Sequence, residues 1–249
     1  MKIYPSVEEI KEKYQSYKTV PVSTEITSQV SALTVLKKLK NVSSHCYMLE
    51  SNDDANNTGH YTFLGYDPKA EVSCTDYNVR VIDSFGVKNY TGDPRKYINQ
   101  ILDEHKAPKI ENLPTFTGGL VGYFGYDYVK YSEPSLKLDA HDDGNFKDVD
   151  LMLFDKVIAF DNRENKIILI VNVQTDKPEE NYKIAIKELE IMKNIIINGE
   201  EAQIEKPKLK TEFKPLFDGE RYAEMVEKAK HYIKEGDIFE VYDMEEIAV

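Results

Sequence analysis

Two polar residues at the end of an apolar run are the first candidates for chemistry. Glu50 and Ser51 follow "HCYML" and precede the polar stretch "NDDANNTG". A carboxylate can take the ammonium of a small ligand, and a hydroxyl beside it can donate or accept a hydrogen bond. Strand ends also commonly carry polar turn residues, and composition alone favours that simpler interpretation.

The stretch "TGGLVGYFGYDYV" is the second candidate. Four glycines, Gly118, Gly119, Gly122 and Gly125, alternate there with apolar and aromatic residues. Glycine weakens a strand unless a ligand or another backbone must approach closely. The spacing matches neither GxxxxGK[ST] nor GxGxxG, so it is not a phosphate loop. The residues alone favour tight packing over a ligand-facing wall.

The remaining polar residues form no catalytic or metal-binding pattern. The five histidines are scattered, none has metal-ligand spacing, and none pairs with a plausible nucleophile. The acidic stretch "DAHDDGNFKDVD" lacks the spacing of an EF-hand loop and is interpreted as a solvated loop. From the residues we predict no catalytic side chain and no metal ligand.

Composition limits the class of protein. The chain has 249 residues, 41% of them hydrophobic, and a formal net charge of -12. This charge argues against nucleic acid or an anionic membrane surface as the main partner. Without a signal-like segment or a membrane-length apolar run, we expect a cytoplasmic protein. Cys46 and Cys74 are expected to be reduced, buried thiols.

The elements that must position these residues follow from local patterns. "SVEEIKEKYQSY", with a capping box of Ser6 and Glu9, and "QVSALTVLKKLK" predict two short helices before residue 45. "HCYMLES", "HYTFLGY", "AEVSCT" and "NVRVIDS" predict an antiparallel meander. A helix is expected to follow, with Pro94 in its first turn.

The second half of the chain continues this alternation of strands and helices. "DVDLMLFDKVIAFDNRENKIILIVNV" predicts one long hairpin, and its continuous apolar runs indicate that both faces are covered. A helix capped by Asp176 and ended by Gly199 is expected next, then a charged linker and an amphipathic helix ending at Gly236. The fold class is therefore α+β, with antiparallel sheet dominant.

Together these motifs resemble anthranilate synthase component I, a chorismate-utilising enzyme. The resemblance lies in "YMLES" (47–51), "GHYTFLGYDP" (59–68), "TGGLVGYFGYDYVKYSE" (117–133), "DLMLFDKVIAFD" (150–161) and "YAEMVEKAKHYIKEGDIF" (222–239), in this order. It covers nearly all of residues 1–241. Aminodeoxychorismate synthase component I shares much of the pattern and stays an alternative.

The resemblance implies a fold, a reaction and a ligand. It implies antiparallel sheets packed as a two-layer sandwich with flanking helices. Full-length members convert chorismate to anthranilate and pyruvate, with Mg²⁺ and with ammonia from a glutamine amidotransferase subunit, anthranilate synthase component II. Their N-terminal half binds the feedback inhibitor L-tryptophan. By this resemblance Ser51, Glu50, Met48 and Tyr61 are assigned to tryptophan binding.

The sequence departs from the family pattern in two respects. His60 stands near the start of the second strand, where the family usually has an arginine or a lysine, which puts a carboxylate-holding role there in doubt. The family is about twice as long, and its Mg²⁺ ligands and catalytic residues correspond to positions beyond residue 249. We therefore expect an N-terminal tryptophan-binding region over 1–205. Residues 206–249 would hold a linker, a helix and the start of a truncated chorismate-binding domain.

Residues 235–249 allow two hypotheses about function. "EGDIF" at 235–239 follows the family pattern, where a strand should begin, whereas "YDMEEIAV" at 242–249 does not. One hypothesis is an N-terminal portion of anthranilate synthase component I that is inactive alone. The other is a non-catalytic regulatory module that binds tryptophan or a partner subunit.

Overall fold

The structure is a computed structural model that describes residues 2–50, 60–133, 135–136, 144–204, 208, 214–215, 217–240 and 247–248. The chain forms two compact units, Met1–Gln203 and Ile204–Val249. The roles expected for residues 1–205 and 206–249 stay predictions.

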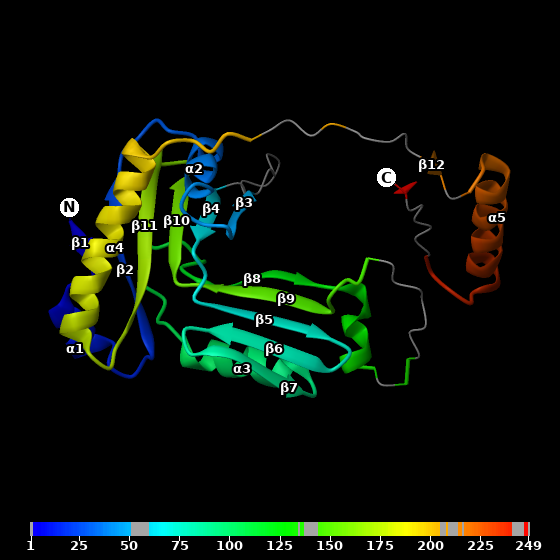
Figure 1. Cartoon of the computed structure of the whole chain (residues 1–249), viewed down its shortest axis with the longest axis horizontal. Helices are drawn as coiled ribbons and strands as arrows, with labels where there is room; N and C mark the ends of the chain where they lie inside the picture. The colour runs from blue at the N-terminus through cyan, green and yellow to red at the C-terminus, as the bar shows by residue number, and fades with distance from the viewer. Residues whose placement is uncertain are drawn as a thin grey trace. The chain divides into compact units, whose positions relative to one another are not determined.

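The first unit contains a six-stranded antiparallel sheet in the order β1-β2-β11-β10-β4-β3 (Figure 1). Its strands are β1 (Ile3–Tyr4), β2 (Thr19–Ile26), β3 (Cys46–Glu50), β4 (Tyr61–Tyr66), β10 (Lys156–Asp161) and β11 (Lys166–Gln174). The predicted turn "DNREN" is confirmed, because Asp161 pairs with Lys166 across it. This hairpin forms the middle of the sheet.

Strand β2 was not predicted, because the first 45 residues showed only helical patterns. It pairs along its whole length with β11, and Val20 and Val22 are fully buried. Pro21 lies between them and cannot donate a ladder hydrogen bond. The strand tolerates it because β1 pairs only with Ser23 and Thr24, which leaves the outer side of β2 open at Pro21.

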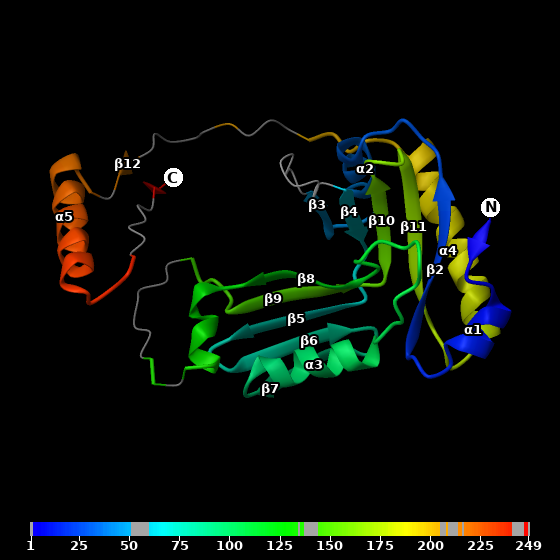
Figure 2. The same ribbon diagram turned by 180° about the vertical axis from the view of Figure 1, so that it is seen from behind.

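Three helices cover one face of this sheet: α1 (Val7–Lys13), α2 (Ala32–Leu39) and α4 (Pro178–Asn198). Figure 2 shows α4 lying along the strands. The core beneath α4 is built from side chains at helical spacing: Ala185, Leu189, Met192 and Ile196. Burial of this stripe, rather than helix propensity, holds α4 in place.

The residues that begin and end the helices were mostly predicted correctly. The capping box of α1 is confirmed, since the Glu9 amide donates to Ser6 Oγ and the Ser6 amide donates to Glu9 Oε2. Gly199 ends α4 as expected. The prediction that Asp176 caps α4 is wrong, because the helix begins at Pro178 with Lys177 at the N-cap. Asp176 instead accepts from Asn181 Nδ2 at 2.9 Å.

A second antiparallel sheet in the same unit has the order β7-β6-β5-β9-β8. Its strands are β5 (Ala70–Thr75), β6 (Asn78–Asp83), β7 (Gly86–Thr91), β8 (Gly119–Phe124) and β9 (Val149–Phe154). Figure 1 shows them running across the strands of the first sheet. One face is covered by α3 (Pro94–Glu104) and the 3₁₀ helix η1 (Tyr126–Tyr131) around a second core.

Two sequence predictions are corrected by this division into sheets. The expected single meander is split after Tyr66, because β3 and β4 belong to the first sheet and β5 to β7 belong to the second. The expected long hairpin is split at Asp155, because β9 pairs with β5 and β8 while β10 pairs with β4 and β11. The α+β class, with two antiparallel sheets and flanking helices, is confirmed.

The prediction that both faces of the β10–β11 hairpin are covered is also confirmed. One face packs beneath the helices. The other face buries Val157, Ala159, Ile168 and Ile170 against partly buried aromatic side chains of β4 and the segment before β8. Cys46 and Cys74 are free thiols, as expected, and lie in different sheets. Cys74 is buried as predicted, whereas Cys46 is only partly buried.

The second unit contains α5 (Gly219–Glu235) and a short pair of strands, β12 (Lys214–Pro215) and β13 (Ile247–Ala248). Asp218 caps α5 by accepting from the Arg221 amide, and Gly236 ends it with φ of 83°. None of the described side chains of α5 is buried. A strand expected from Ile238 is not formed at 238–240, and Val241 lies outside the described residues.

Candidate functional site

The strand end predicted to bind a ligand lies on β3, at the edge of the first sheet. Met48 pairs with Leu64 and Glu50 pairs with Thr62. Directly opposed residues of antiparallel strands share a face of the sheet. Met48 packs against the core beneath the helices, and Glu50, two residues further, is exposed on that same face.

Tyr61 lies on the opposite face, because side chains alternate along a strand and its neighbour Thr62 faces Glu50. Its ring stacks on His60, with ring centroids 3.9 Å apart, and lies 5.7 Å from the ring of Phe63. The structure therefore brings Met48 and Glu50 together and places Tyr61 apart from them. Ser51 lies outside the described residues, so tryptophan binding by these four residues stays a prediction.

His60 is held by a buried carboxylate that sequence reasoning did not connect with it. Its Nε2 lies 3.0 Å from Oδ1 of Asp161, whose side chain is only 4% exposed. The same oxygen accepts hydrogen bonds from the amides of Arg163 and Glu164. Burial alone would raise the pKa of Asp161, but these amides and His60 outweigh it and hold the pKa below its ordinary value.

The glycine-rich segment is explained mainly by close packing, the interpretation that the residues favoured. A Cβ at Gly122 would overlap the carbonyl oxygen of Asp150 on the adjacent strand β9. A Cβ at Gly118, where φ is +146°, would lie 2.5 Å from Asn172 Nδ2 and 3.0 Å from the carbonyl oxygen of Phe154. Glycine is thus required where β8 and the preceding turn meet the backbone of β9.

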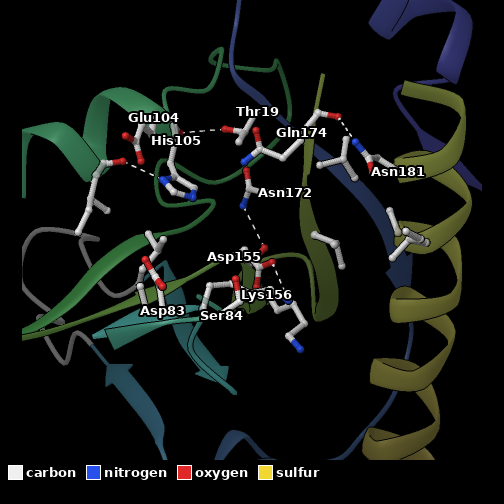
Figure 3. Close-up of a pocket in the computed structure, with 18 of the residues that line it drawn as sticks. Thr19, Asp83, Ser84, Glu104, His105, Asp155, Lys156, Asn172, Gln174 and Asn181 are labelled. Atoms are coloured by element: carbon white, nitrogen blue, oxygen red, sulfur yellow. Dashed lines mark hydrogen bonds and ion pairs between the residues drawn. The ribbon is translucent and has the colours of Figure 1, made fainter. Parts of the chain in front are cut away.

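A cavity with a polar lining lies where the two sheets, α3 and α4 meet, and sequence reasoning missed it. Its volume is about 570 Å³. Figure 3 shows that its polar side chains come from several elements. They are Thr19, Lys69, Asp83, Ser84, Glu104, His105, Asp155, Lys156, Asn172, Gln174, Asn181 and Glu188.

Two adjacent charged residues, Asp155 and Lys156, line this cavity at the β9–β10 junction. Lys156 is buried, with Nζ 2.6 Å from Asp67 Oδ2, 3.6 Å from Glu188 Oε2 and 4.9 Å from the centre of the Tyr66 ring. Burial acts to lower the pKa of Lys156, but Asp67 first, then Tyr66 and Asp155, raise the pKa above its ordinary value. Burial raises the pKa of Asp155, and the nearby lysines only partly oppose this.

One sequence signal could have pointed to the cavity. Asp155 and Lys156 interrupt the otherwise apolar run "LMLFDKVIAF". Charged residues are rarely buried unless they are paired or functional, so such an interruption indicates a paired or functional position. The other lining residues carry no local signal, since they approach from positions as distant as Thr19 and Glu188.

The described residues contain neither a cluster of metal-binding side chains nor a membrane-spanning helix. Within the described ranges no group of three or more His, Cys, Asp and Glu side chains could hold a metal ion. The described residues therefore include no side-chain group that would hold the Mg²⁺ of the resembled family. No helix in the described part of the chain is both long and apolar enough to cross a membrane.

Comparison with known proteins defines the class. Residues 44–243 match the model of the chorismate-binding enzyme family. The chain belongs to this family.

The similar curated proteins are anthranilate synthases. The chain is 33% identical over 236 residues to anthranilate synthase component 1 of Acinetobacter calcoaceticus, covering 92% of the chain and 47% of the relative. It is 30% identical over 252 residues to anthranilate synthase component 1 of Aquifex aeolicus, covering 97% and 50%. The chain thus spans about half the length of these curated relatives.

A solved structure supports the fold. Anthranilate synthase component I from Streptococcus pneumoniae superposes with a TM-score of 0.53 at 23% identity. The alignment covers 85% of this chain and 46% of that one. At this identity the likeness concerns the fold alone.

Proposed function

We propose that this chain supplies the N-terminal half of an anthranilate synthase component 1. The whole enzyme would convert chorismate and ammonia from glutamine into anthranilate and pyruvate, in tryptophan biosynthesis. The observation that carries the proposal is the 33% identity to the Acinetobacter calcoaceticus enzyme, sustained over 92% of the chain. The antiparallel two-sheet fold, shared with a solved component I, is consistent with it.

The proposal assigns no catalytic residue to this chain. Mg²⁺ binding and the chemical steps would belong to the remaining length of the relatives, since the described residues offer no group of metal ligands. A glutamine amidotransferase subunit, component 2, is proposed as the partner of the whole enzyme. L-Tryptophan is proposed as its feedback inhibitor, bound through Ser51, Glu50, Met48 and Tyr61.

A chimeric enzyme tests this function. Residues 1–239 of this chain would replace the matching half of the Acinetobacter calcoaceticus enzyme. With chorismate, Mg²⁺ and ammonium, we expect the chimera to give the fluorescence of anthranilate, whereas the 249-residue chain alone gives none. A robust signal from the chain alone, or a folded chimera without activity, would overturn the proposal.

The same chimera tests the inhibitor site. Tryptophan should inhibit the chimera, and Ser51→Ala should raise the half-inhibiting concentration at least about tenfold, because a pocket built to hydrogen-bond its ligand loses affinity when one partner is removed. Ser44→Ala, outside the four assigned residues, is the matched control and should leave inhibition unchanged. Equal inhibition of both variants would remove Ser51 from the site.

Calorimetry separates this proposal from a free-standing regulatory module. We expect weak or no tryptophan binding by the 249-residue chain, because half a pocket does not enclose a small ligand. Saturable binding that disappears in Ser51→Ala would favour the module instead.

A further inference from the structure

The cavity between the sheets contains a carboxylate that the protein leaves incompletely bonded. Oδ1 of Asp155 is buried and has no hydrogen-bond partner among the described residues. Oδ2 lies 3.6 Å from Lys69 Nζ, and the side chain is 18% exposed. Rotation about the Cβ–Cγ bond exchanges the two oxygens, so either can meet a donor that enters the cavity. A buried acceptor without a partner costs free energy that a ligand donor would recover.

His105 supplies a second acceptor from another wall of the same cavity. Its Nδ1 lies 2.8 Å from the carbonyl oxygen of Ile101. A carbonyl oxygen can only accept, so the hydrogen must sit on Nδ1, and Nε2 of the neutral ring then carries a lone pair. No hydrogen bond to Nε2 is formed within the described part of the chain. Figure 3 shows His105 and Asp155 on different walls of the cavity.

Several amide and ammonium donors of the cavity are already engaged with protein acceptors. Asn172 Nδ2 donates to the carbonyl oxygens of Thr117, at 2.6 Å, and Asp155, at 3.2 Å. Asn181 Nδ2 donates to the carbonyl oxygen of Gln174 at 2.9 Å. Lys156 donates to Asp67 at 2.6 Å. Among the described side chains of the cavity, the buried polar atom without a partner is an acceptor, Asp155 Oδ1.

Charge and shape add to this preference for a donor. Three further carboxylates line the cavity, those of Asp83, Glu104 and Glu188. Apolar side chains from both sheets and from two helices complete the walls: Val81, Ile101, Leu153, Val171, Val173 and Ile184. Gly118 and Gly119 line a side pocket of about 80 Å³ that shares Thr19, His105, Leu153, Asp155 and Asn172 with the main cavity.

We propose that this cavity binds a small primary amine with an apolar body, whose ammonium donates to Asp155, with His105 as a second acceptor in the same cavity. The volume of about 570 Å³ falls in the range of small-molecule sites. The site is separate from the strand end of β3, and the proposal does not depend on the catalytic role proposed above. It also gives the glycine pair 118–119 a ligand-facing role besides packing.

Calorimetry on the 249-residue chain tests the proposal with three probes of the same body. 2-Phenylethylamine presents an ammonium, 2-phenylethanol a neutral hydroxyl and 3-phenylpropionate a carboxylate. We expect saturable 1:1 binding of the amine, with the other two at least about tenfold weaker. Absence of saturable amine binding, or equal affinity for amine and alcohol, would overturn the proposal.

Matched variants locate the binding. Asp155→Asn should weaken amine binding at least about tenfold. Glu190→Gln removes the same charge from an exposed position of α4 outside this cavity and should leave the affinity within about twofold. Asp155→Asn is expected to fold, because burial raises the pKa of Asp155 and its charge therefore costs stability at neutral pH.

A second variant keeps the test decisive if Asp155→Asn does not fold. Ile184 lines the cavity from α4 and is 57% exposed, so a lysine there is tolerated by the fold. Ile184→Lys brings a competing ammonium to the mouth of the cavity and should also weaken amine binding at least about tenfold. If the folded variants bind the amine as the wild type does, the amine sits elsewhere and the proposal is wrong.

Discussion

At the scale of single residues, the first unit depends on buried polar groups that satisfy one another, and Asp148 is the centre of such a group. Its Oδ2 accepts from Tyr131 Oη at 2.6 Å and from the amide of Asp76 at 2.9 Å, while Lys130 Nζ lies 3.0 Å from Oδ1. Tyr131 Oη also accepts from the amide of Tyr77. Asp76 and Tyr77 both have positive φ, so this network stabilises a strained turn between β5 and β6.

Asp148→Asn should therefore lower the free energy of unfolding by about 2 to 3 kcal/mol at pH 7, because the buried Tyr131 hydroxyl loses its charged acceptor and the partly buried Lys130 keeps only Asp76 as a carboxylate partner. Burial alone would raise the pKa of Asp148, but the hydrogen bonds from Tyr131, Lys130 and the Asp76 amide outweigh it and lower the pKa. A carboxyl with a lowered folded pKa stabilises the fold above its unfolded pKa of about 3.9, and this contribution is lost as the pH falls through the folded value.

Urea unfolding at several pH values measures this effect. The difference between wild type and Asp148→Asn should be full at pH 7 and shrink below about pH 4. Asp150→Asn is the control, because Asp150 pairs with Lys147 at the surface and its loss should cost less than about 1 kcal/mol. A pH-independent difference for Asp148→Asn would show that its charge does not contribute to stability.

At the scale of elements, helix ends and turns could be predicted where neighbouring residues determine them. Three features depend on a few adjacent residues and were predicted: the capping box of Ser6, the end of α4 at Gly199 and the β10–β11 turn. The assignment of strands to sheets depends on pairing between segments far apart in the sequence. The predicted assignment was wrong for the meander. Strand β2 was missed because Pro21 breaks its pattern, although pairing with β11 overrides this local preference.

The same distinction applies to the candidate sites. Alternation along β4 shows from sequence that Tyr61 and Thr62 face opposite sides, but the separation of Tyr61 from Met48 also depends on the β3–β4 register, which only the structure gives. The cavity could not be inferred, because its walls come from both sheets and two helices. Only the charged pair Asp155–Lys156 within an apolar run carried a local signal.

The close contact of β8 with β9 supports an element-scale prediction at Gly122. Gly122→Ala should lower the free energy of unfolding by about 2 to 4 kcal/mol, because the added methyl group would overlap the backbone of Asp150, which cannot move without breaking the strand pair. Urea unfolding followed by circular dichroism measures it. At Gly219 an added Cβ meets no atom within 4 Å, so Gly219→Ala should have little effect. A Gly122→Ala chain as stable as wild type would show that β8 can shift away from β9.

At the scale of the whole molecule, the buried core formed by the described residues lies in the first unit. The buried hydrophobic residues among those described run from Ile10 to Ile196, and none lies in α5. The core beneath the helices joins α1, α2 and α4 to the first sheet, and the second core joins α3 and η1 to the second. Both cores are therefore complete before residue 204, where the second unit begins.

This distribution predicts that residues 1–203 fold without the second unit. A chain ending at Gln203 should unfold cooperatively at the same temperature as the 249-residue chain, because its apolar burial is unchanged. Circular dichroism during heating measures both transitions. A chain ending at Ala185 is the control. It lacks Leu189, Met192 and Ile196, which α4 buries against the sheet, and it should lose the cooperative transition. A lower transition temperature for the chain ending at Gln203 would show that residues 204–249 contribute to the stability of the first unit, and that its core is not sufficient by itself.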